Sequence, residues 1–310
     1  MSAGRRRRCR GDGCDHAGGP SGPGGGRPAR RRDGRDVNPP VALTIAGSDS
    51  GGGAGIQGDL RTFAALGVFA TTAITAVTAQ NTVEVRVVHA LPPELVTAQV
   101  EAVLDDLPVA AVKTGMLATA AIIGAVGDLA DAGRLANLVV DPVMVSSSGA
   151  RLLEADAEHA YVERLLPVAA VITPNRAEAA VLCGGEIRTL ADQREAARAL
   201  AGLGAGAVVV KGGHPAAGSG GDAVDVVADG RTGRMRELRA PWVESGNVHG
   251  TGCGLSSAIA AGLALGVGVD DAIDQAKAFV HAAIAGSVTW RIGTGRGPLD
   301  HFGWQQDGDR

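Results

Sequence analysis

The segment His249-Gly250-Thr251-Gly252-Cys253-Gly254 combines three glycines, a hydroxyl and a thiol directly before an apolar stretch. That stretch predicts a helix over 252–265. Glycines at a helix N-terminus leave backbone N–H groups unpaired at the positive end of the helix dipole. Such a site stabilises the charge that develops on a phosphoryl group during transfer. The thiol of Cys253 is expected to have a lowered pKa at this terminus, although a small buried hydrophobe is the alternative role for a cysteine there.

A second glycine-rich segment, 53–58, reads G-x-G-x-x-G between a predicted strand and a predicted helix. A nicotinamide site is nevertheless disfavoured, because the connection over 47–52 is long and polar. In addition, Ala79-Gln80-Asn81 stand about 20 residues further on, where an acidic ribose ligand is expected. We interpret the segment as a source of backbone donors that approach another ligand closely. Asp59, one turn into the helix, is expected to reach into the same cleft.

Polar residues also follow the predicted strands. They are Asp49, Lys113, Asp141, Asn175 and Lys211. Because ligands of doubly wound sheets bind at the carboxyl ends of the strands, these side chains are expected to line one cleft. The chain has only three lysines against 26 arginines, so Lys113 and Lys211 indicate compact charges near a ligand. Ordinary loop positions are the alternative for both lysines.

The elements that position these residues alternate between strands and helices. Apolar runs predict buried strands over 41–46, 71–78, 109–112, 138–141, 169–172 and 207–210, and a hairpin is predicted over 223–240. Helices are predicted over 55–66, 93–104, 119–130, 157–166, 176–183, 190–203, 252–265 and 270–288. This alternation predicts an α/β fold, doubly wound, whose mostly parallel central sheet has helices on both faces.

The 310 residues carry a net charge of −4 that is unevenly distributed. Residues 1–36 contain ten arginines and four aspartates, whereas the rest of the chain has a net charge of −10. With ten glycines and few apolar residues, 1–36 are predicted to be a disordered tail, and 37–310 to be one domain. No run of apolar residues is long enough to predict a membrane span. Aromatic residues, 3% of the chain, argue against an aromatic nucleic-acid platform.

The run Arg5–Arg8 is compatible with binding to nucleic acid or anionic lipid, and it resembles a twin-arginine signal without the apolar region that such a signal needs. A solvated tail, or translation from an upstream start codon, is the simpler explanation. Cys9, Cys14 and His16 lack a fourth partner for zinc. Four cysteines without a disulfide framework indicate a reducing compartment, so we expect a cytoplasmic protein. The motifs of P-loop proteins and of protein kinases are absent.

Nine short motifs between about residue 41 and residue 303 resemble, in order, those of the hydroxymethylpyrimidine/phosphomethylpyrimidine kinase family. They lie at 42–49, 52–57, 78–82, 113–117, 141–144, 172–175, 211–214, 249–253 and 297–301. The family belongs to the ribokinase-like superfamily and makes the pyrimidine half of thiamine by two successive ATP-dependent phosphorylations. The resemblance therefore implies a ribokinase-like fold, with ATP as co-substrate and Mg²⁺ as cofactor.

For the acceptor, the resemblance implies a pyrimidine site. Gln80 would read the amino-pyrimidine edge, Asp59 would add a second polar contact, and Met116 would form an apolar wall. Gly47 and Ala54 complete the substrate-binding residues that it implies.

For phosphoryl transfer, the resemblance places Cys253 at the catalytic position and Gly250, Thr251 and Gly252 in an anion hole. We expect Cys253 to serve as a base for an alcohol acceptor. A phosphate monoester is already mostly ionised at pH 7, so the second reaction should need no base.

For the nucleotide, the resemblance implies that Lys211, Asn175 and Gly213 lie near the ATP phosphates. Asp141 and Glu178, the glutamate of the superfamily's N-x-x-E motif, would hold Mg²⁺, partly through water.

Two segments depart from the family pattern. The residues Ser48–Gly52 lack the proline that usually precedes the two glycines, and the segment 145–150 has Ser147 and Ala150 where many members have Lys and Asp. The second departure bears on charged contacts from that loop and on the affinity for ATP.

The closest alternative is a pyridoxal or pyridoxine kinase of the same superfamily, because those vitamins also carry hydroxymethyl groups on nitrogen heterocycles. A sugar kinase is less favoured, since Cys253 stands where sugar kinases have Asp. A ligand-binding regulator on an inactive kinase fold is disfavoured by the intact Gly250–Cys253 turn. The expected partners are the pyrimidine substrate and ATP, with no membrane and no nucleic acid, and relatives are commonly homodimers.

Overall fold

The structure is a computed structural model that describes residues 38–144, 157–215 and 220–304. The predicted tail over 1–36, with Arg5–Arg8 and the Cys9, Cys14 and His16 group, lies outside these residues. The departures at Ser147 and Ala150 also lie outside them.

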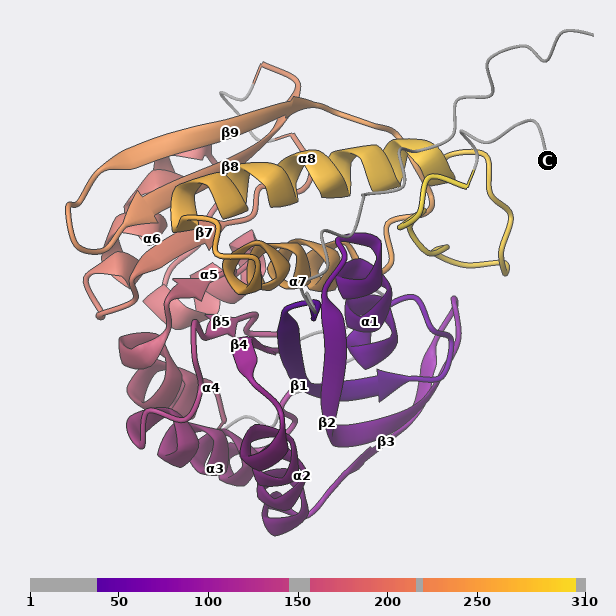
Figure 1. Ribbon diagram of the computed structural model, residues 1–310. Coiled ribbons are helices and arrows are strands. Elements are labelled where there is room, and N and C mark those ends of the chain that lie inside the picture. Colours follow the sequence, from indigo (N-terminus) through magenta and orange to yellow (C-terminus); the bar gives the residue numbers. More distant parts are fainter. Residues whose placement is uncertain (1–37, 145–156, 216–219, 305–310) are drawn as a thin grey trace, which may run out of the picture. The chain divides into compact units, whose positions relative to one another are not determined.

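The described strands form one nine-stranded sheet, in the order β3-β2-β1-β4-β5-β6-β7-β8-β9 (Figure 1). They are β1 (Val41–Asp49), β2 (Phe69–Gln80), β3 (Val85–Ala90), β4 (Val109–Thr114), β5 (Val139–Val140), β6 (Val171–Ile172), β7 (Ala207–Val210), β8 (Asp222–Asp229) and β9 (Met235–Pro241). The strands from β2 to β7 in the sheet order are parallel, and β3, β8 and β9 pair antiparallel with their neighbours. The prediction of a mostly parallel sheet is confirmed.

Helices cover both faces of this sheet. They are α1 (Gly55–Ala65), α2 (Pro93–Asp106), α3 (Ala120–Asp131), α4 (Ala157–Ala160), α5 (Arg176–Cys183), α6 (Leu190–Ala201), α7 (Thr251–Ala264) and α8 (Val269–Ser287). One core packs α2, α3, α5 and α6 against strand residues such as Leu43 and Ile45. The other packs α1, α7 and α8 against the alternate residues, such as Ala42 (Figure 1). Since the strands are buried on both faces, they read as continuous apolar runs.

The order of the strands reverses beside β1. The chain runs outward from β1 through β2 to β3, and it then returns to place β4 on the other side of β1. At such a point the connections leave in opposite directions and open a crevice at the carboxyl ends of the strands. The glycine-rich segment after β1 and the Lys113–Gly115 segment at the end of β4 both lie there.

One observed strand was not predicted, and one predicted helix differs from the observed structure. β3 was missed although residues 83–87 alternate valine with a charged residue, as in a strand, and it exposes most of its side chains at the edge of the sheet. The helix predicted over 157–166 is one turn of α4 followed by a π-helical turn, η1 (Tyr161–Leu165), and a 3₁₀ turn, η2 (Leu166–Val168). Among the described residues, no helix is long and apolar enough to cross a membrane.

Candidate active site

A cavity of about 1050 Å³ opens at the carboxyl ends of the central strands. Its wall includes all the sequence-predicted site residues except Asp59. They are Gly47, Ala54, Gln80, Met116, Asp141, Asn175, Glu178, Lys211, Gly213, Gly250, Thr251, Gly252 and Cys253. The fold thus brings motifs that are spread over more than 200 residues of sequence to one place.

The turn before α7 depends on glycine. Gly250 is the N-cap of α7 and has a φ of 88°, in the left-handed region. A Cβ at this position would overlap the carbonyl oxygen of Gly53, and a Cβ on Gly53 would overlap the ring of His249. The two glycine-rich segments therefore interlock. The first-turn N–H groups of Gly252 and Cys253 have no carbonyl within the helix to bond, so they are available to an anion.

Cys253 lies in that first turn and lines the cavity. Burial raises the pKa of its thiol to about 11, while Lys113 lowers it and Asp59 and Asp141 raise it further. The sequence-based expectation of a lowered pKa is wrong, because the loss of hydration outweighs the helix terminus. At neutral pH Cys253 is a neutral thiol.

A lysine–carboxylate pair stands beside the start of α7. Lys211 Nζ lies 2.7 Å from Asp141 Oδ1 and 3.8 Å from Glu178 Oε2. A Cβ on Gly252 would lie 3.1 Å from the Lys211 ammonium. Burial alone would raise the pKa of Asp141, but Lys211 and Lys113 lower it below its ordinary value. The ammonium adds positive charge next to the predicted anion hole.

The N-x-x-E motif is a capping box at the start of α5. The Asn175 side chain accepts from the Glu178 backbone N–H at 2.9 Å, and Glu178 Oε2 accepts from the Asn175 backbone N–H at 2.7 Å. A parallel bridge between Asn175 and Lys211 brings this motif to the end of β7. Burial raises the pKa of Glu178 to about 7, with Lys211 opposing this effect and Asp141 adding to it.

Asp141 and Glu178 are the candidate ligands for Mg²⁺. In the described part of the chain, no group of three or more His, Cys, Asp or Glu side chains is arranged to hold a metal ion. Magnesium in phosphoryl-transfer sites is usually held by one or two carboxylates together with the substrate's phosphates and water. The Asp141 charge raises the pKa of Glu178, and the two carboxylates lie 2.7 and 3.8 Å from the Lys211 ammonium, so the pair fits a magnesium ion that arrives with a nucleotide.

The acceptor end of the cavity is tightly packed. Met116 fills the space beside Gly47, where a Cβ would overlap the Met116 methyl group. Gln80 ends β2, and its Nε2 lies 3.4 Å from His249 Nε2. The predicted pyrimidine-reading amide thus meets the turn before α7, and Met116 lines the same cavity.

His249 and Asp49 form a contact that sequence reasoning missed. His249 Nε2 lies 2.8 Å from Asp49 Oδ2. The Asp49 carboxylate also accepts from the backbone N–H groups of Gly51, Gly53 and Ala54, at 2.8–3.1 Å. Burial alone would raise the pKa of Asp49, but these hydrogen bonds lower it. Both residues stood in recognised motifs, yet they are 200 positions apart and nothing in one sequence pairs them.

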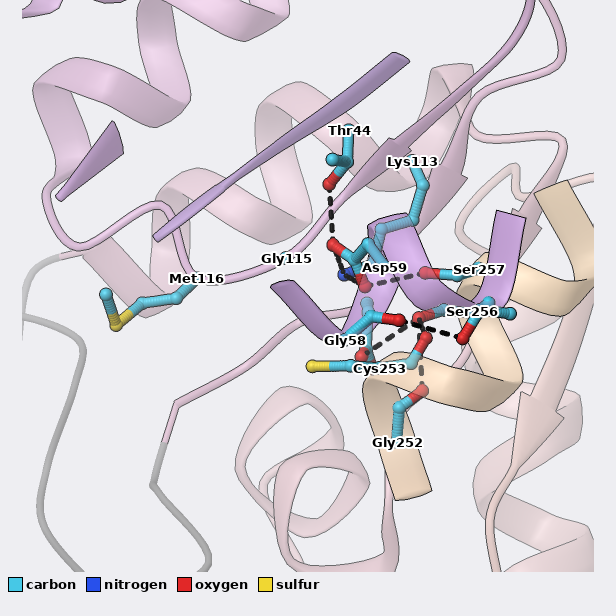
Figure 2. A network of polar contacts seen from close by, with 12 residues as sticks. Thr44, Gly58, Asp59, Lys113, Gly115, Met116, Gly252, Cys253, Ser256 and Ser257 are labelled. Atoms are coloured by element: carbon cyan, nitrogen blue, oxygen red, sulfur yellow. Dashed lines mark hydrogen bonds and ion pairs between the residues drawn. The ribbon is translucent and has the colours of Figure 1, made fainter. Parts of the chain in front are cut away.

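The prediction that Asp59 reaches into the cleft is wrong. Its side chain is fully buried beneath the cavity wall and binds the ammonium of Lys113 (Figure 2). Thr44 and Ser257 donate their hydroxyls to the same carboxylate, each at 2.6 Å. The Lys113 side chain is also fully buried, and it lines the cavity, in accord with its place at the end of a predicted strand.

One part of the cavity wall, made of apolar and aromatic side chains, was not predicted. The rings of His214 and Trp242 lie 4.7 Å apart between centroids, and both residues line the cavity. Val243, Val280 and Ile284 add apolar surface. These residues come from the loops after β7 and β9 and from α8, and of them only His214 lies in a recognised motif. An apolar and aromatic wall of this kind suits a flat heterocycle such as a purine base.

Comparison with known sequences gives a consistent result. Residues 49–300 match the model of the family described as phosphomethylpyrimidine kinase. A hydroxymethylpyrimidine/phosphomethylpyrimidine kinase of Rhizobium meliloti is 52% identical over 272 residues, covering 86% of this chain and 99% of the relative. One from Streptomyces coelicolor is 48% identical over 268 residues, covering 86% of this chain and 96% of the relative.

Solved structures show the same fold. The ADP complex of Bacillus subtilis pyridoxal kinase has a TM-score of 0.78 at 38% identity, covering 86% of this chain and 99% of that one. A phosphomethylpyrimidine kinase of Clostridium difficile has a TM-score of 0.68 at 39% identity, covering 79% of this chain and 99% of that one. The predicted ribokinase-like fold is confirmed. With the family's motifs gathered around one cavity, these similarities show that the chain belongs to the phosphomethylpyrimidine kinase family.

Proposed function

We propose that this protein transfers a phosphoryl group from ATP to the hydroxymethyl group of 4-amino-5-hydroxymethyl-2-methylpyrimidine, and then phosphorylates that monophosphate to the diphosphate for thiamine biosynthesis. The observation that carries the proposal is the single cavity in which Gln80 and Met116 face the same space as the start of α7 and Lys211. The family membership and the names of the relatives support the same reaction.

The geometry suits phosphoryl transfer because that reaction needs alignment and charge stabilisation more than covalent chemistry. The pyrimidine occupies the end lined by Gly47, Gln80 and Met116, so its alcohol points toward the α7 terminus. The nucleotide lies along the end lined by Lys211 and Gly213. The transferring group then sits at the N–H groups of α7, which stabilise charge on its oxygens.

Asp141 and Glu178 hold the magnesium ion that accompanies ATP. When bound, this ion neutralises charge on the phosphate oxygens. Lys211 contributes a second positive charge and keeps the Asp141 carboxylate in place through the 2.7 Å contact. Asn175, Lys211 and Gly213 remain the proposed contacts to the nucleotide phosphates.

Cys253 acts at the step with the alcohol acceptor. The hydroxymethyl proton must leave as the new P–O bond forms, and the thiol group lies in the turn that receives the phosphoryl group. Because burial raises the pKa of Cys253 to about 11, only a small thiolate fraction is present at neutral pH. The monophosphate acceptor is already ionised and needs no such group.

Pyridoxal is the competing acceptor, because pyridoxal kinases are among the solved structures that resemble this chain. A Staphylococcus aureus pyridoxal kinase in complex with AMP-PCP and pyridoxal has a TM-score of 0.76 at 35% identity. The relatives from Rhizobium meliloti, Streptomyces coelicolor and Synechococcus elongatus, which are 48–52% identical, carry the pyrimidine name instead. This difference favours the pyrimidine.

The test is ATP consumption by the purified full chain with Mg²⁺ and one acceptor at a time. Turnover with hydroxymethylpyrimidine and with its monophosphate is the expected result. Turnover with pyridoxal alone would overturn the role of Gln80. A folded sample that turns over none of the three contradicts the proposed function.

Three further properties belong to the proposal. Residues 37–310 form the catalytic domain and 1–36 a basic tail that takes no part in turnover, in accord with their charge difference. The location is cytoplasmic, in accord with the free thiols of Cys183 and Cys253. The protein works without nucleic acid or membrane, as a homodimer.

A further inference from the structure

Beneath the cavity wall, four elements meet at one carboxylate (Figure 2). Asp59 on α1 accepts from Lys113 Nζ of β4 with both oxygens, at 3.0 and 2.9 Å. Its Oδ2 also accepts from the Thr44 hydroxyl of β1, and its Oδ1 accepts from the Ser257 hydroxyl of α7, both at 2.6 Å. Asp59, Lys113, Thr44 and Ser257 are all fully buried. We call these four residues the Asp59 cluster.

The cluster links the start of α7, which is proposed to receive the phosphoryl group, to the residues proposed to hold the acceptor. Ser257 is four residues after Cys253, so the two side chains lie one turn apart on the same side of α7. Lys113 is followed by Gly115 and Met116 of the acceptor wall, and a Cβ on Gly115 would lie 2.8 Å from the Lys113 ammonium. The Asp59–Ser257 hydrogen bond thus joins the first turns of α7 to the strand ends that hold the acceptor.

Stability alone is a poor explanation for a fully buried ion pair. Removing two charges from water is costly, and apolar residues of similar volume often stabilise a core equally well. Here the Asp59 carboxylate accepts hydrogen bonds from two hydroxyl groups as well as from the ammonium of Lys113. Such directional contacts fix relative positions in a way that apolar packing does not.

We infer that Asp59 and Lys113 are positioning residues, which act through Ser257 to hold the anion hole of α7 in register with the acceptor wall. The expected effect on kcat rests on the proposed function, whereas the geometry of the cluster is independent of it. Asp59 does not line the cavity, and the Lys113 side chain, which does, donates its two hydrogen bonds to Asp59. Their effect is on alignment, and a displacement of about 1 Å between reacting groups lowers the rate on the order of a hundredfold.

Two substitutions separate this role from simple loss of a buried bond. Ser257→Ala removes the link to α7, and Thr44→Val removes a hydrogen bond of equal length from the same carboxylate. β1 remains held by its ladders with β2 and β4, so the loss of the Thr44 bond leaves the register unchanged. We expect kcat to fall about tenfold or more for Ser257→Ala, with KM nearly unchanged, and to stay within about twofold for Thr44→Val.

The ion pair is tested with Asp59→Asn and with the double variant Asp59→Asn/Lys113→Met. Both should lower kcat roughly a hundredfold for hydroxymethylpyrimidine and for its monophosphate alike, because both acceptors depend on the same alignment. Ile123→Ala in the core under α3 serves as the control. It should lower the melting temperature while leaving kcat of the folded enzyme unchanged.

Hydrogen exchange of the peptide that begins α7 gives a readout that needs no substrate. Exchange should be faster in Ser257→Ala and Asp59→Asn than in the wild type, and unchanged in Thr44→Val and Ile123→Ala. If the wild type turns over neither pyrimidine but the exchange pattern appears, the proposed function fails and the positioning role stands. Wild-type kcat and wild-type exchange in folded Ser257→Ala and Asp59→Asn would overturn the inference. So would equal losses of kcat in Ser257→Ala and Ile123→Ala.

Discussion

At the end of the cavity proposed for the acceptor, Asp49 is buried and held by other parts of the chain, whereas at the end proposed for the nucleotide the Glu186–Arg188 pair lies largely in solvent. Asp49 is 4% exposed and binds three backbone N–H groups and His249. The Arg188 side chain, by contrast, is 77% exposed, and its partner Glu186 is 75% exposed. Both arrangements line the same cavity.

This contrast follows from what each end must recognise. A small rigid heterocycle offers few contacts, so its alcohol is aligned only if the surrounding wall is already in place. A nucleotide is large and highly charged, and it gains affinity from several separate contacts. We therefore expect substitutions at the acceptor end, at the start of α7 and at Lys211 beside it to lower kcat, and those elsewhere at the nucleotide end to raise KM for ATP.

The largest effect is expected from Gly250→Ala. A Cβ there would overlap the Gly53 carbonyl oxygen and force apart the two interlocked glycine segments. We expect a loss of about a thousandfold in kcat with either acceptor, as for removal of a transition-state donor. The matched control is Gly266→Ala at the other end of α7, where φ is also positive at 80° but nothing lies within 4 Å of the added Cβ. Equal losses of activity in folded samples of both variants would show that backbone strain, and not the anion hole, is responsible.

The second-largest effect is expected from Lys211→Met, which should lower kcat about a hundredfold for both acceptors. The substitution removes positive charge beside the first turn of α7 and leaves the buried Asp141 without the partner at 2.7 Å. Lys277 is a matched control, since its ammonium also pairs with a buried aspartate, Asp225, at 2.9 Å. Lys277→Met should raise KM for ATP more than it lowers kcat. The reverse order of effects would contradict the division of the cavity into two ends.

Cys253→Ala should separate the two reactions. We expect the first phosphorylation to lose about a hundredfold and the second to change by less than about threefold, because only the alcohol must give up a proton. For the wild type, the first reaction should also rise with pH between 7 and 10, since the pKa of Cys253 lies at about 11. The alanine variant should lose that rise. Equal losses in the two separately assayed steps would leave Cys253 a packing or electrostatic role.

The smallest effect is a pH dependence of the magnesium requirement. Burial raises the pKa of Glu178 from 4.5 to about 7, so below pH 7 a bound proton competes with the metal ion. The Mg²⁺ concentration for half-maximal turnover should rise up to about tenfold between pH 8 and pH 6. Glu178→Gln removes this competition and serves as the control for titration of ATP itself. An identical pH dependence in both proteins would remove Glu178 from the metal site.

The fold was largely accessible from the sequence because its signals are local. Because the central strands are buried on both faces, each appears in the sequence as a short apolar run. The Asp229-Gly230 pair marks the hairpin turn that joins β8 to β9. β3 lacks the continuous apolar run of the central strands, and its signal, the alternation of valine with charged residues over 83–87, was overlooked. The π-helical turn at Tyr161–Leu165 has the same apolar spacing as an α-helix over so short a stretch.

The Gly250–Cys253 turn could be recognised from its own chemistry, whereas Glu178 and the acceptor residues were predicted from the family resemblance. Apart from Asp59, both groups line the cavity. Asp59 was misplaced because position along a helix does not reveal which face meets the sheet, and its partner Lys113 lies 54 residues away. The pKa of Cys253 was misjudged for a related reason, since burial depends on the whole fold.

The central claim is that one cavity presents two successive acceptors to the same helix terminus. The most direct test is to follow the products of hydroxymethylpyrimidine and excess ATP over time by phosphorus NMR with the purified full chain and Mg²⁺. We predict that the monophosphate appears first and is then converted to the diphosphate, and that Gly250→Ala abolishes both steps while Gly266→Ala abolishes neither. Accumulation of monophosphate with no diphosphate, or loss of only one step in Gly250→Ala, would contradict the claim.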